Sequence, residues 1–328
     1  MTVATNFAKF ARSHLRQELW KLLFNCIHKY LQSNLQYYIG CSGWSYSSWL
    51  GPFYPKGIEN SKWLKYYSQV FNYVEVDSTF YRIPSEFMVK NWYKRTPENF
   101  RFTAKFPKVI THDRRLADFD EDQLNYFFES ISELKGKLLA LLIQLPPSID
   151  IVKGLDALRI ILPFLDKRFR YAMEVRHRSW FPDLAYNFLA NNNMCLVWSQ
   201  LADIKTPPIV TSDFIYVQFI GDRSIHEKDF GTIQIDKIKE MKKVARNFKK
   251  DSGESDLSRI RFSIVAANNH YAGFGPGTVN IFRQLLGLEE VKWGDDFISS
   301  EDLEKDDFMD TDKQVLKSKQ TNLSDFLK

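Results

Sequence analysis

Cysteine is scarce in this 328-residue chain, which has Cys26, Cys41 and Cys195 without the spacing of a disulfide framework or a CxxC motif. That usage is typical of a reducing compartment and predicts a cytoplasmic protein. No apolar run approaches the roughly 20 residues that cross a bilayer. The sequence also lacks the pattern of a signal peptide, which is an apolar stretch followed by a small-residue cleavage site. We therefore expect no membrane partner.

Histidine and glycine motifs are scarce as well. The six histidines form no HxH or HExxH pattern, so no metal ligand is assigned. Strand-end carboxylates and loop histidines leave a divalent-metal site of mixed oxygen and nitrogen ligands as an alternative, and the cofactor stays unknown. No glycine-rich phosphate turn follows the first predicted strand, which disfavours a doubly wound nucleotide-binding sheet.

Charge is uneven along the chain rather than large. The net charge is +5, yet residues 1–36 carry five bases and one acid, while residues 289–328 carry six bases and twelve acids. The body between them is mildly basic, which permits contact with nucleic acid without requiring it. We predict an amphipathic helical extension over 1–36 and an acidic, disordered tail over 289–328.

Residues 37–288 alternate short apolar segments with amphipathic ones. The pattern predicts eight strands separated mostly by helices, from a first strand at Tyr37–Cys41 through a sixth at Met194–Gln200 to an eighth at Ile260–Ala267. Eight such units over about 250 residues predict an α/β fold, a TIM-type (β/α)8 barrel.

The strand at Val74–Asp77 is unusual because it is apolar on one side only. Alternate strand residues point to opposite faces, so Val74 and Val76 share one face and Glu75 and Asp77 the other. The same spacing puts Glu174 and Arg176 together. In a barrel of this type the chemistry lies at the carboxyl ends of the strands, so these side chains are expected to meet at one mouth.

Strand ends and the loops beyond them supply the candidate site residues. Three are predicted to be catalytic: Glu75, Lys105 and Glu174. Seven are predicted to bind substrate: Trp44, Asp77, Tyr81, Gln144, Arg176, His177 and Asn268. The alternative is a buried ionic layer in which the acids and bases only neutralise one another. We favour a functional pocket, because desolvation makes such a layer a weak source of stability.

The stretch 320–327 ends the tail with an apolar cluster. Gln320, Leu323, Phe326 and Leu327 have the spacing of a sliding-clamp-interacting peptide, the PIP box. A short peptide of this kind folds on binding and lays its apolar anchors in a groove. The resemblance predicts a sliding clamp of the PCNA type as partner. The alternative is an incidental short helix.

Several motifs resemble domain-of-unknown-function family 72, the YecE-like proteins. They include Gly40–Tyr46, Val74–Arg82, Phe102–Pro107, Gln144–Pro147 and Glu174–His177, and the resemblance extends over about residues 37–288. It implies a TIM-type barrel and no particular reaction.

The chain departs from this family's pattern at four positions. Asp77 stands where the family usually has asparagine, Gln218 and Ile220 replace an arginine and a histidine, and Ala267 replaces an aromatic residue. These departures put in doubt any anion site built on the seventh predicted strand.

Three functional hypotheses remain open. The first is an enzyme, a hydrolase of the nuclease kind, that acts on DNA in repair or processing and is recruited by a sliding clamp. The second is a carbohydrate or small-molecule hydrolase, since paired carboxylates and aromatic side chains also suit sugars. The third is a barrel that binds a ligand without turning it over.

Overall fold

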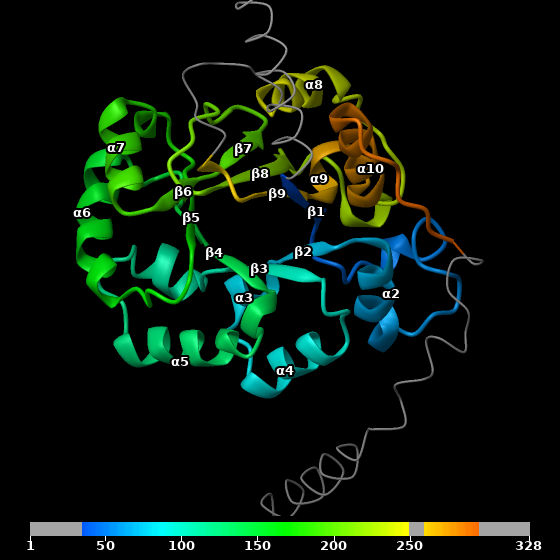
Figure 1. Ribbon diagram of the computed structural model, residues 1–328, viewed down its shortest axis with the longest axis horizontal. Helices are drawn as coiled ribbons and strands as arrows, with labels where there is room; N and C mark the ends of the chain where they lie inside the picture. Colours follow the sequence, from blue (N-terminus) through cyan, green and yellow to red (C-terminus); the bar gives the residue numbers. More distant parts are fainter. Residues whose placement is uncertain (1–34, 249–258, 295–328) are drawn as a thin grey trace, which may run out of the picture.

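Nine strands form one parallel sheet in the described residues, 35–248 and 259–294, of this computed structural model (Figure 1). The sheet curves into a nearly closed barrel with helices outside it. The strands are β1 (Gln36–Ser42), β2 (Tyr73–Val76), β3 (Arg101–Lys105), β4 (Leu138–Gln144), β5 (Tyr171–Glu174), β6 (Met194–Leu196), β7 (Trp198–Leu201), β8 (Phe214–Gly221) and β9 (Phe262–Ala267).

The sixth strand predicted at Met194–Gln200 is divided in the structure into two strands, β6 and β7, so the sheet has nine strands rather than eight. The order along the sheet is β6-β5-β4-β3-β2-β1-β9-β8-β7. β6 pairs with β5 and β7 pairs with β8, with Val197 alone between the two halves. The segment therefore pairs first with β5 and then with β8. At this point the barrel is closed by the covalent chain rather than by hydrogen bonds between two strands.

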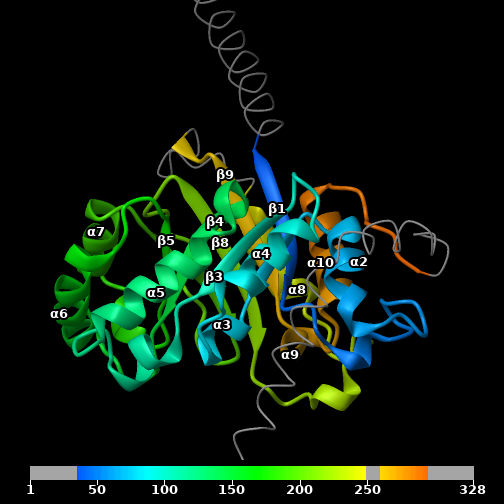
Figure 2. The same cartoon turned by 90° about the horizontal axis from the view of Figure 1, so that it is seen from below.

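Helices cover the outside of the strands, as a view from below also shows (Figure 2). They are α2 (Trp63–Val70), α3 (Ser78–Tyr81), α4 (Glu86–Lys94), α5 (Glu121–Ser132), α6 (Ile151–Ile161), α7 (Asp183–Asn191), α8 (Ile238–Asn247), α9 (Asn269–Ala272) and α10 (Gly275–Leu286). The Asp120 side chain accepts hydrogen bonds from two backbone amides of the first turn of α5, and Gly287 ends α10 at φ +79°. Among the described helices, none combines the length and hydrophobicity needed to cross a bilayer.

Two hydrophobic clusters lie on the two faces of the sheet. Val74 and Val76 belong to the large cluster between strands and helices, whereas Tyr73 belongs to a smaller cluster inside the barrel. The predicted sidedness of this strand is therefore confirmed, and Glu75 lies on the inner side with no exposed surface.

Packing on the barrel continues past residue 288. The Trp293 indole packs on Phe53 at 5.5 Å between ring centroids and donates a hydrogen bond to the Pro52 carbonyl at 2.9 Å. Residues 1–34 and 295–328, which hold most of the predicted extension and tail, lie outside the described residues.

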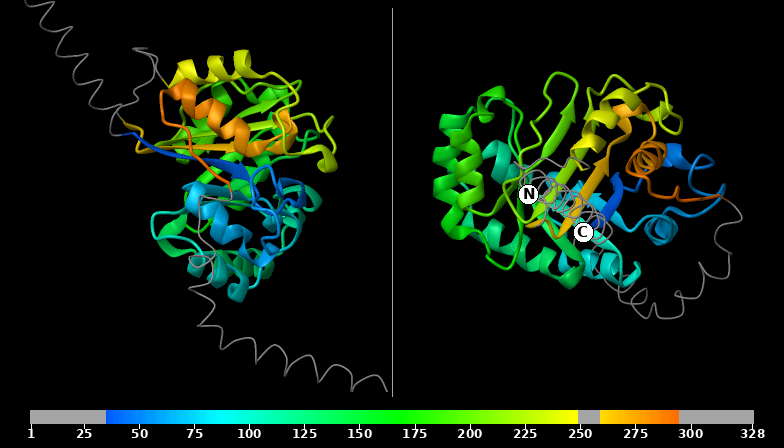
Figure 3. Two further views of the ribbon diagram at one scale, coloured as in Figure 1. Left: turned by 90° about the vertical axis from the view of Figure 1, so that its right-hand side faces the viewer. Right: turned by 45° about the horizontal axis from the view of Figure 1, so that its top comes forward.

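The views in Figure 3 show α8 and α10 side by side on one flank of the barrel.

Candidate active site

A cavity of about 680 Å³ opens at the carboxyl ends of the strands, and we call it the mouth cavity. It is lined by Ser42, Tyr46, Glu75, Asp77, Phe80, Tyr81, Lys105, Gln144, Arg176, Leu201, Ala202, Asp203, Gln218, Ile220, Gly221, Asp222, Arg223, Glu227, Phe230, Asn268 and His270. Most of the strands contribute their last inward-facing residue, which is the position expected for chemistry in this fold.

Glu75 is held at the floor of the mouth cavity by four side chains. Its Oε1 accepts a hydrogen bond from the Ser42 hydroxyl at 2.8 Å and lies 3.0 Å from the Lys105 ammonium. Its Oε2 accepts hydrogen bonds from Tyr216 and, at 2.7 Å, from the Gln218 amide. The carboxylate is thus fully partnered, as a buried charge must be.

Phenol and hydroxyl groups support this carboxylate from below. The hydroxyls of Tyr73, Thr103 and Tyr216 lie within 2.6–2.9 Å of one another. Tyr216 therefore reaches Glu75 from a hydrogen-bonded triangle inside the barrel. A network of this kind fixes the direction of each group.

A second buried carboxylate, that of Glu174, lies close enough to Lys105 to raise its pKa. Glu174 has no exposed surface, accepts a hydrogen bond from the Gln144 amide at 2.8 Å and pairs with the Arg176 guanidinium at 2.6 Å. Gln144 and Arg176 line the mouth cavity, whereas Glu174 lies behind them. Its position suits a group that orients its two neighbours.

The ion pair of Glu75 and Lys105 stays charged near neutral pH. Burial by itself would raise the pKa of Glu75, but the Lys105 ammonium and the hydrogen bonds from Tyr216 and Ser42 outweigh it, so the pKa lies below its ordinary value. Burial would likewise lower the pKa of Lys105, but the nearby carboxylates raise it. Neither group is therefore suited to exchanging a proton near pH 7.

Asp77 differs from these two carboxylates. It forms no salt bridge within the part of the chain that the structure describes, and Gly43 brings the backbone close to its Oδ1. Burial raises the pKa of Asp77; the Lys105 ammonium opposes this rise and repulsion from Glu75 adds to it. A carboxyl group with a raised pKa in a cavity is a candidate proton donor or acceptor.

The rim of the mouth cavity combines aromatic rings with polar groups. Tyr46, Phe80, Tyr81 and Phe230 contribute the rings, and Tyr81 is 74% exposed. His270 packs edge-on against Phe230, and its Nδ1 donates to the Ile225 carbonyl at 3.0 Å, because a carbonyl can only accept. Burial lowers the pKa of His270 despite that bond, which favours a neutral ring.

A family model described as "Protein of unknown function DUF72" matches residues 38–301. This chain belongs to the DUF72 family. The resemblance found in the strand motifs is therefore confirmed, and it covers the whole barrel.

Curated relatives in the DUF72 family carry no named activity. UPF0759 protein YecE of Escherichia coli (strain K12) is 34% identical over 144 residues, which make up 44% of this chain and 50% of YecE. UPF0759 protein YunF of Bacillus subtilis (strain 168) is 34% identical over 149 residues, 44% of this chain and 52% of YunF. The match thus spans about half the length of each relative.

Two DUF72 family proteins of known structure share the barrel. The crystal structure from Thermotoga maritima MSB8 has a TM-score of 0.62 at 26% identity, covering 77% of this chain and 99% of that one. The structure from Enterococcus faecalis V583 has a TM-score of 0.61 at 22% identity, covering 78% and 99%. These likenesses support the predicted TIM-like architecture.

Most of the site residues predicted from this DUF72 sequence come together. Glu75, Asp77, Tyr81, Lys105, Gln144, Arg176 and Asn268 line the mouth cavity. Asn268 also caps α9 by accepting from the His270 amide. Trp44 and His177 lie outside the lining: Trp44 packs against Trp92, and His177 is exposed and caps a short helix at Arg178–Trp180.

Other residues of the site were not predicted. Tyr216 approaches Glu75 from the strand position two before Gln218, so strand periodicity was a signal for it. Tyr46 and Phe230 reach the cavity from loops, where no periodicity applies, and His270 reaches it from the short helix α9 that follows β9. The clamp-binding residues Gln320, Leu323, Phe326 and Leu327 lie outside the described residues.

Among the same described residues, no group of three or more His, Cys, Asp or Glu side chains is placed to hold a metal ion. Cys41 and Cys195 are buried and unpaired by disulfides. Burial raises the pKa of the Cys41 thiol above its ordinary range, which makes it a poor ligand or nucleophile.

Proposed function

We propose that the mouth cavity is the active site of a hydrolase that uses Asp77 to transfer a proton to or from a small, uncharged polar molecule. The observation that carries the proposal is one carboxyl group of raised pKa beside a buried, fully charged Glu75–Lys105 pair. That pair supplies a fixed electric field, and Asp77 supplies the proton.

The charge balance of the lining supports an uncharged substrate. Five acidic side chains, those of Glu75, Asp77, Asp203, Asp222 and Glu227, face three basic ones, those of Lys105, Arg176 and Arg223. Binding to a nucleic-acid backbone instead depends on an excess of lysine and arginine. Aromatic rings beside hydrogen-bonding groups suit a carbohydrate, whose ring faces are apolar and whose edges are polar. The cavity therefore favours the small-molecule hypothesis over a DNA strand.

Substitution of Asp77 by asparagine tests the chemistry. Asparagine is the residue that the resembling proteins usually have here, so the fold should tolerate it, and it cannot carry the proton. In a panel of nitrophenyl glycosides and esters, we expect wild-type turnover of at least one compound and a loss of about 10²–10⁴-fold in Asp77→Asn. Asp113→Asn, an exposed aspartate outside the cavity, is the matched control.

A carboxyl-carbon NMR titration tests Asp77 without any substrate. We expect Asp77 to titrate above the ordinary aspartate value of about 3.9, because burial and Glu75 disfavour its charge. Titration at or below that value, or full turnover by Asp77→Asn, would contradict the assignment. Tight binding of a compound with no turnover by the wild type would instead favour the ligand-binding barrel.

Recruitment to DNA is a second, separate proposal, and the observation that favours it is the motif at 320–327. Gln320, Leu323, Phe326 and Leu327 match the anchors of a clamp-interacting peptide. This proposal concerns where the protein acts rather than which bond it breaks.

Binding of the full-length chain to its sliding clamp tests recruitment. We expect calorimetry to show binding by the intact chain and none after deletion of 320–327, with Gln320→Ala and Phe326→Ala each weaker than wild type, because these side chains fill the groove of the partner. Deletion of 311–319, which spares the motif, is the control. If the intact chain does not bind, the DNA-repair hypothesis loses its support.

A further inference from the structure

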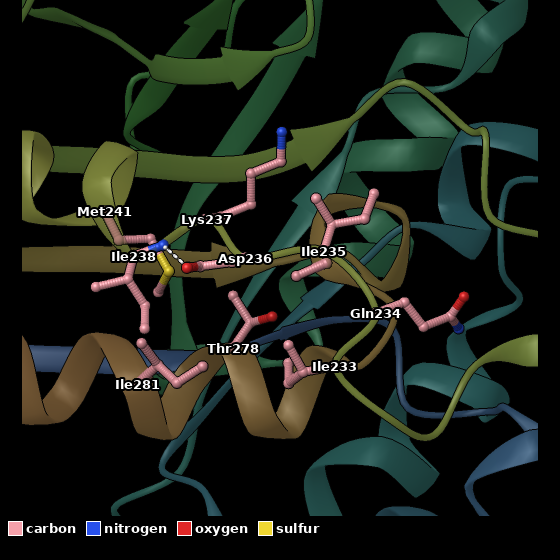
Figure 4. Close-up of a pocket in the computed structure, with 10 residues that line it drawn as sticks. Ile233, Gln234, Ile235, Asp236, Lys237, Ile238, Met241, Thr278 and Ile281 are labelled. Atoms are coloured by element: carbon pink, nitrogen blue, oxygen red, sulfur yellow. Dashed lines mark hydrogen bonds between the residues drawn. The ribbon is translucent and has the colours of Figure 1, made fainter.

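An apolar groove of about 330 Å³ lies between α8 and α10, away from the mouth cavity, and we call it the α8–α10 groove. Figure 4 shows its lining side chains, with Ile238 and Met241 from α8 facing Thr278 and Ile281 from α10. Ile233 closes one end and is 41% exposed, and Ile238 is 37% exposed. Branched apolar side chains left this open to water suit an apolar occupant.

The helix α8, which forms one wall of this groove, is strongly basic on its exposed side, whereas the charged residues of the lining itself are Asp236 and Lys237. α8 carries Lys239, Lys242, Lys243 and Arg246 against Glu240 alone, and the four bases are exposed. Within the described residues, none of these four bases forms a salt bridge. Carboxylates that lie against the exposed side of α8 would therefore be stabilised.

The chain itself contains a segment with matching chemistry. Residues 295–310 carry eight acids and one base. Phe297, Ile298, Leu303, Phe308 and Met309 are distributed among these acids. Apolar anchors flanked by carboxylates suit an apolar groove that lies beside a basic helix.

The last described residues lie close enough for this segment to reach the groove. The Trp293 ring packs against Phe274 with 6.1 Å between centroids. A methyl group added at Gly277 would lie 2.8 Å from Phe274 and 3.2 Å from Ile233, so these side chains are neighbours. Trp293 is thus separated from the groove by about one side chain, and sixteen extended residues span up to roughly 50 Å.

From this match we infer that residues 295–310 dock in the α8–α10 groove of their own chain, with the phenylalanines in the groove and the acids along α8. Tethering favours this intramolecular contact over a free partner, because the local concentration of a linked segment is high. The inference is independent of the chemistry proposed for the mouth cavity.

Photo-cross-linking in the full-length chain tests the inference. Benzoylphenylalanine replaces Phe297 or Phe308, and the cross-linked peptides are identified by mass spectrometry. We expect cross-links within one chain to 233–241 or 278–281. Benzoylphenylalanine in place of Phe326, beyond the acidic segment, is the control and should give few cross-links to the groove.

Charge reversal separates specific docking from chance contact. Lys239→Glu, Lys242→Glu, Lys243→Glu and Arg246→Glu together should lower the cross-link yield several-fold, as should 1 M salt, which screens exposed charges. Cross-links that fall elsewhere, occur only between two molecules, or arise equally from position 326 would overturn the inference. A yield unchanged by charge reversal would also overturn it.

Discussion

Replacement of Lys105 by methionine is expected to cost about 3–5 kcal/mol of unfolding free energy at pH 7, because it leaves the Glu75 carboxylate buried without its cation. Glu75 has no exposed surface, and the methionine side chain offers no charge or hydrogen bond in place of the ammonium. Urea unfolding followed by tryptophan fluorescence measures the loss. A cost below about 1 kcal/mol, as for an exposed pair, would contradict this account.

The pH dependence of that loss identifies its cause. In the wild type the pKa of Glu75 is lowered, so the carboxylate adds stability above the ordinary glutamate value of about 4.3 and loses it as the pH falls through the folded value. In Lys105→Met only burial and the hydrogen bonds remain, and burial raises the pKa. The variant should therefore be most destabilised at pH 8 and recover toward pH 4.

Two further variants serve as controls. Glu75→Gln combined with Lys105→Met removes both charges, and we expect it to regain a large part of the stability lost by Lys105→Met alone. Lys90→Met removes one partner of the exposed Lys90–Glu86 pair and should leave the unfolding midpoint unchanged. A double variant no more stable than the single one would show that the charge is not the cause.

Substitution of Gly40 by alanine is the second change with a large expected effect. The new methyl group would lie 1.9 Å from the Tyr73 carbonyl oxygen and 2.7 Å from the Tyr67 hydroxyl. That hydroxyl accepts from the Cys41 amide at 2.7 Å and donates to the Tyr73 carbonyl at 3.0 Å, so it bridges β1 and β2. The backbone has to move apart at this bridge, at a cost of about 3 kcal/mol, the upper end for overpacking.

Gly136→Ala is the matched control for this substitution. A methyl group at Gly136 would meet nothing within 4 Å. We expect it to be neutral or to stabilise the chain by about 0.4–1 kcal/mol, because alanine restricts the unfolded chain more than glycine does. Urea unfolding compares the two variants. Equal midpoints would contradict the close approach of β1 to β2, whereas failure of Gly40→Ala to fold agrees with it.

Periodicity was sufficient to predict the barrel and the floor of its cavity. Glu75 lies on the inner side of β2, and Arg176 pairs with Glu174 two residues before it, as alternation along a strand requires. The runs at β1, β4 and β8 are bounded by glycine or proline, which made their existence clear. Strand order then follows from parallel strands joined by helices.

Other features leave no local trace in the sequence. The break at Val197 changes the strand to which the backbone is hydrogen-bonded, whereas the apolar composition of the segment stays the same. Trp44 and Tyr46 lie two residues apart in one loop, yet only Tyr46 lines the cavity. The path of the loop, and not its composition, determines which of the two side chains reaches the cavity. The raised pKa of Asp77 likewise depends on burial and on neighbours from other strands.

The break between β6 and β7 at Val197 affects how a shift of one strand passes along the wall of the mouth cavity. A ladder of backbone bonds transmits a shift in one strand to the next, but β6 and β7 share no such ladder. Leu201, at the end of β7, stands in the wall of the mouth cavity. The barrel can therefore widen between β6 and β7 while the other strands keep their register.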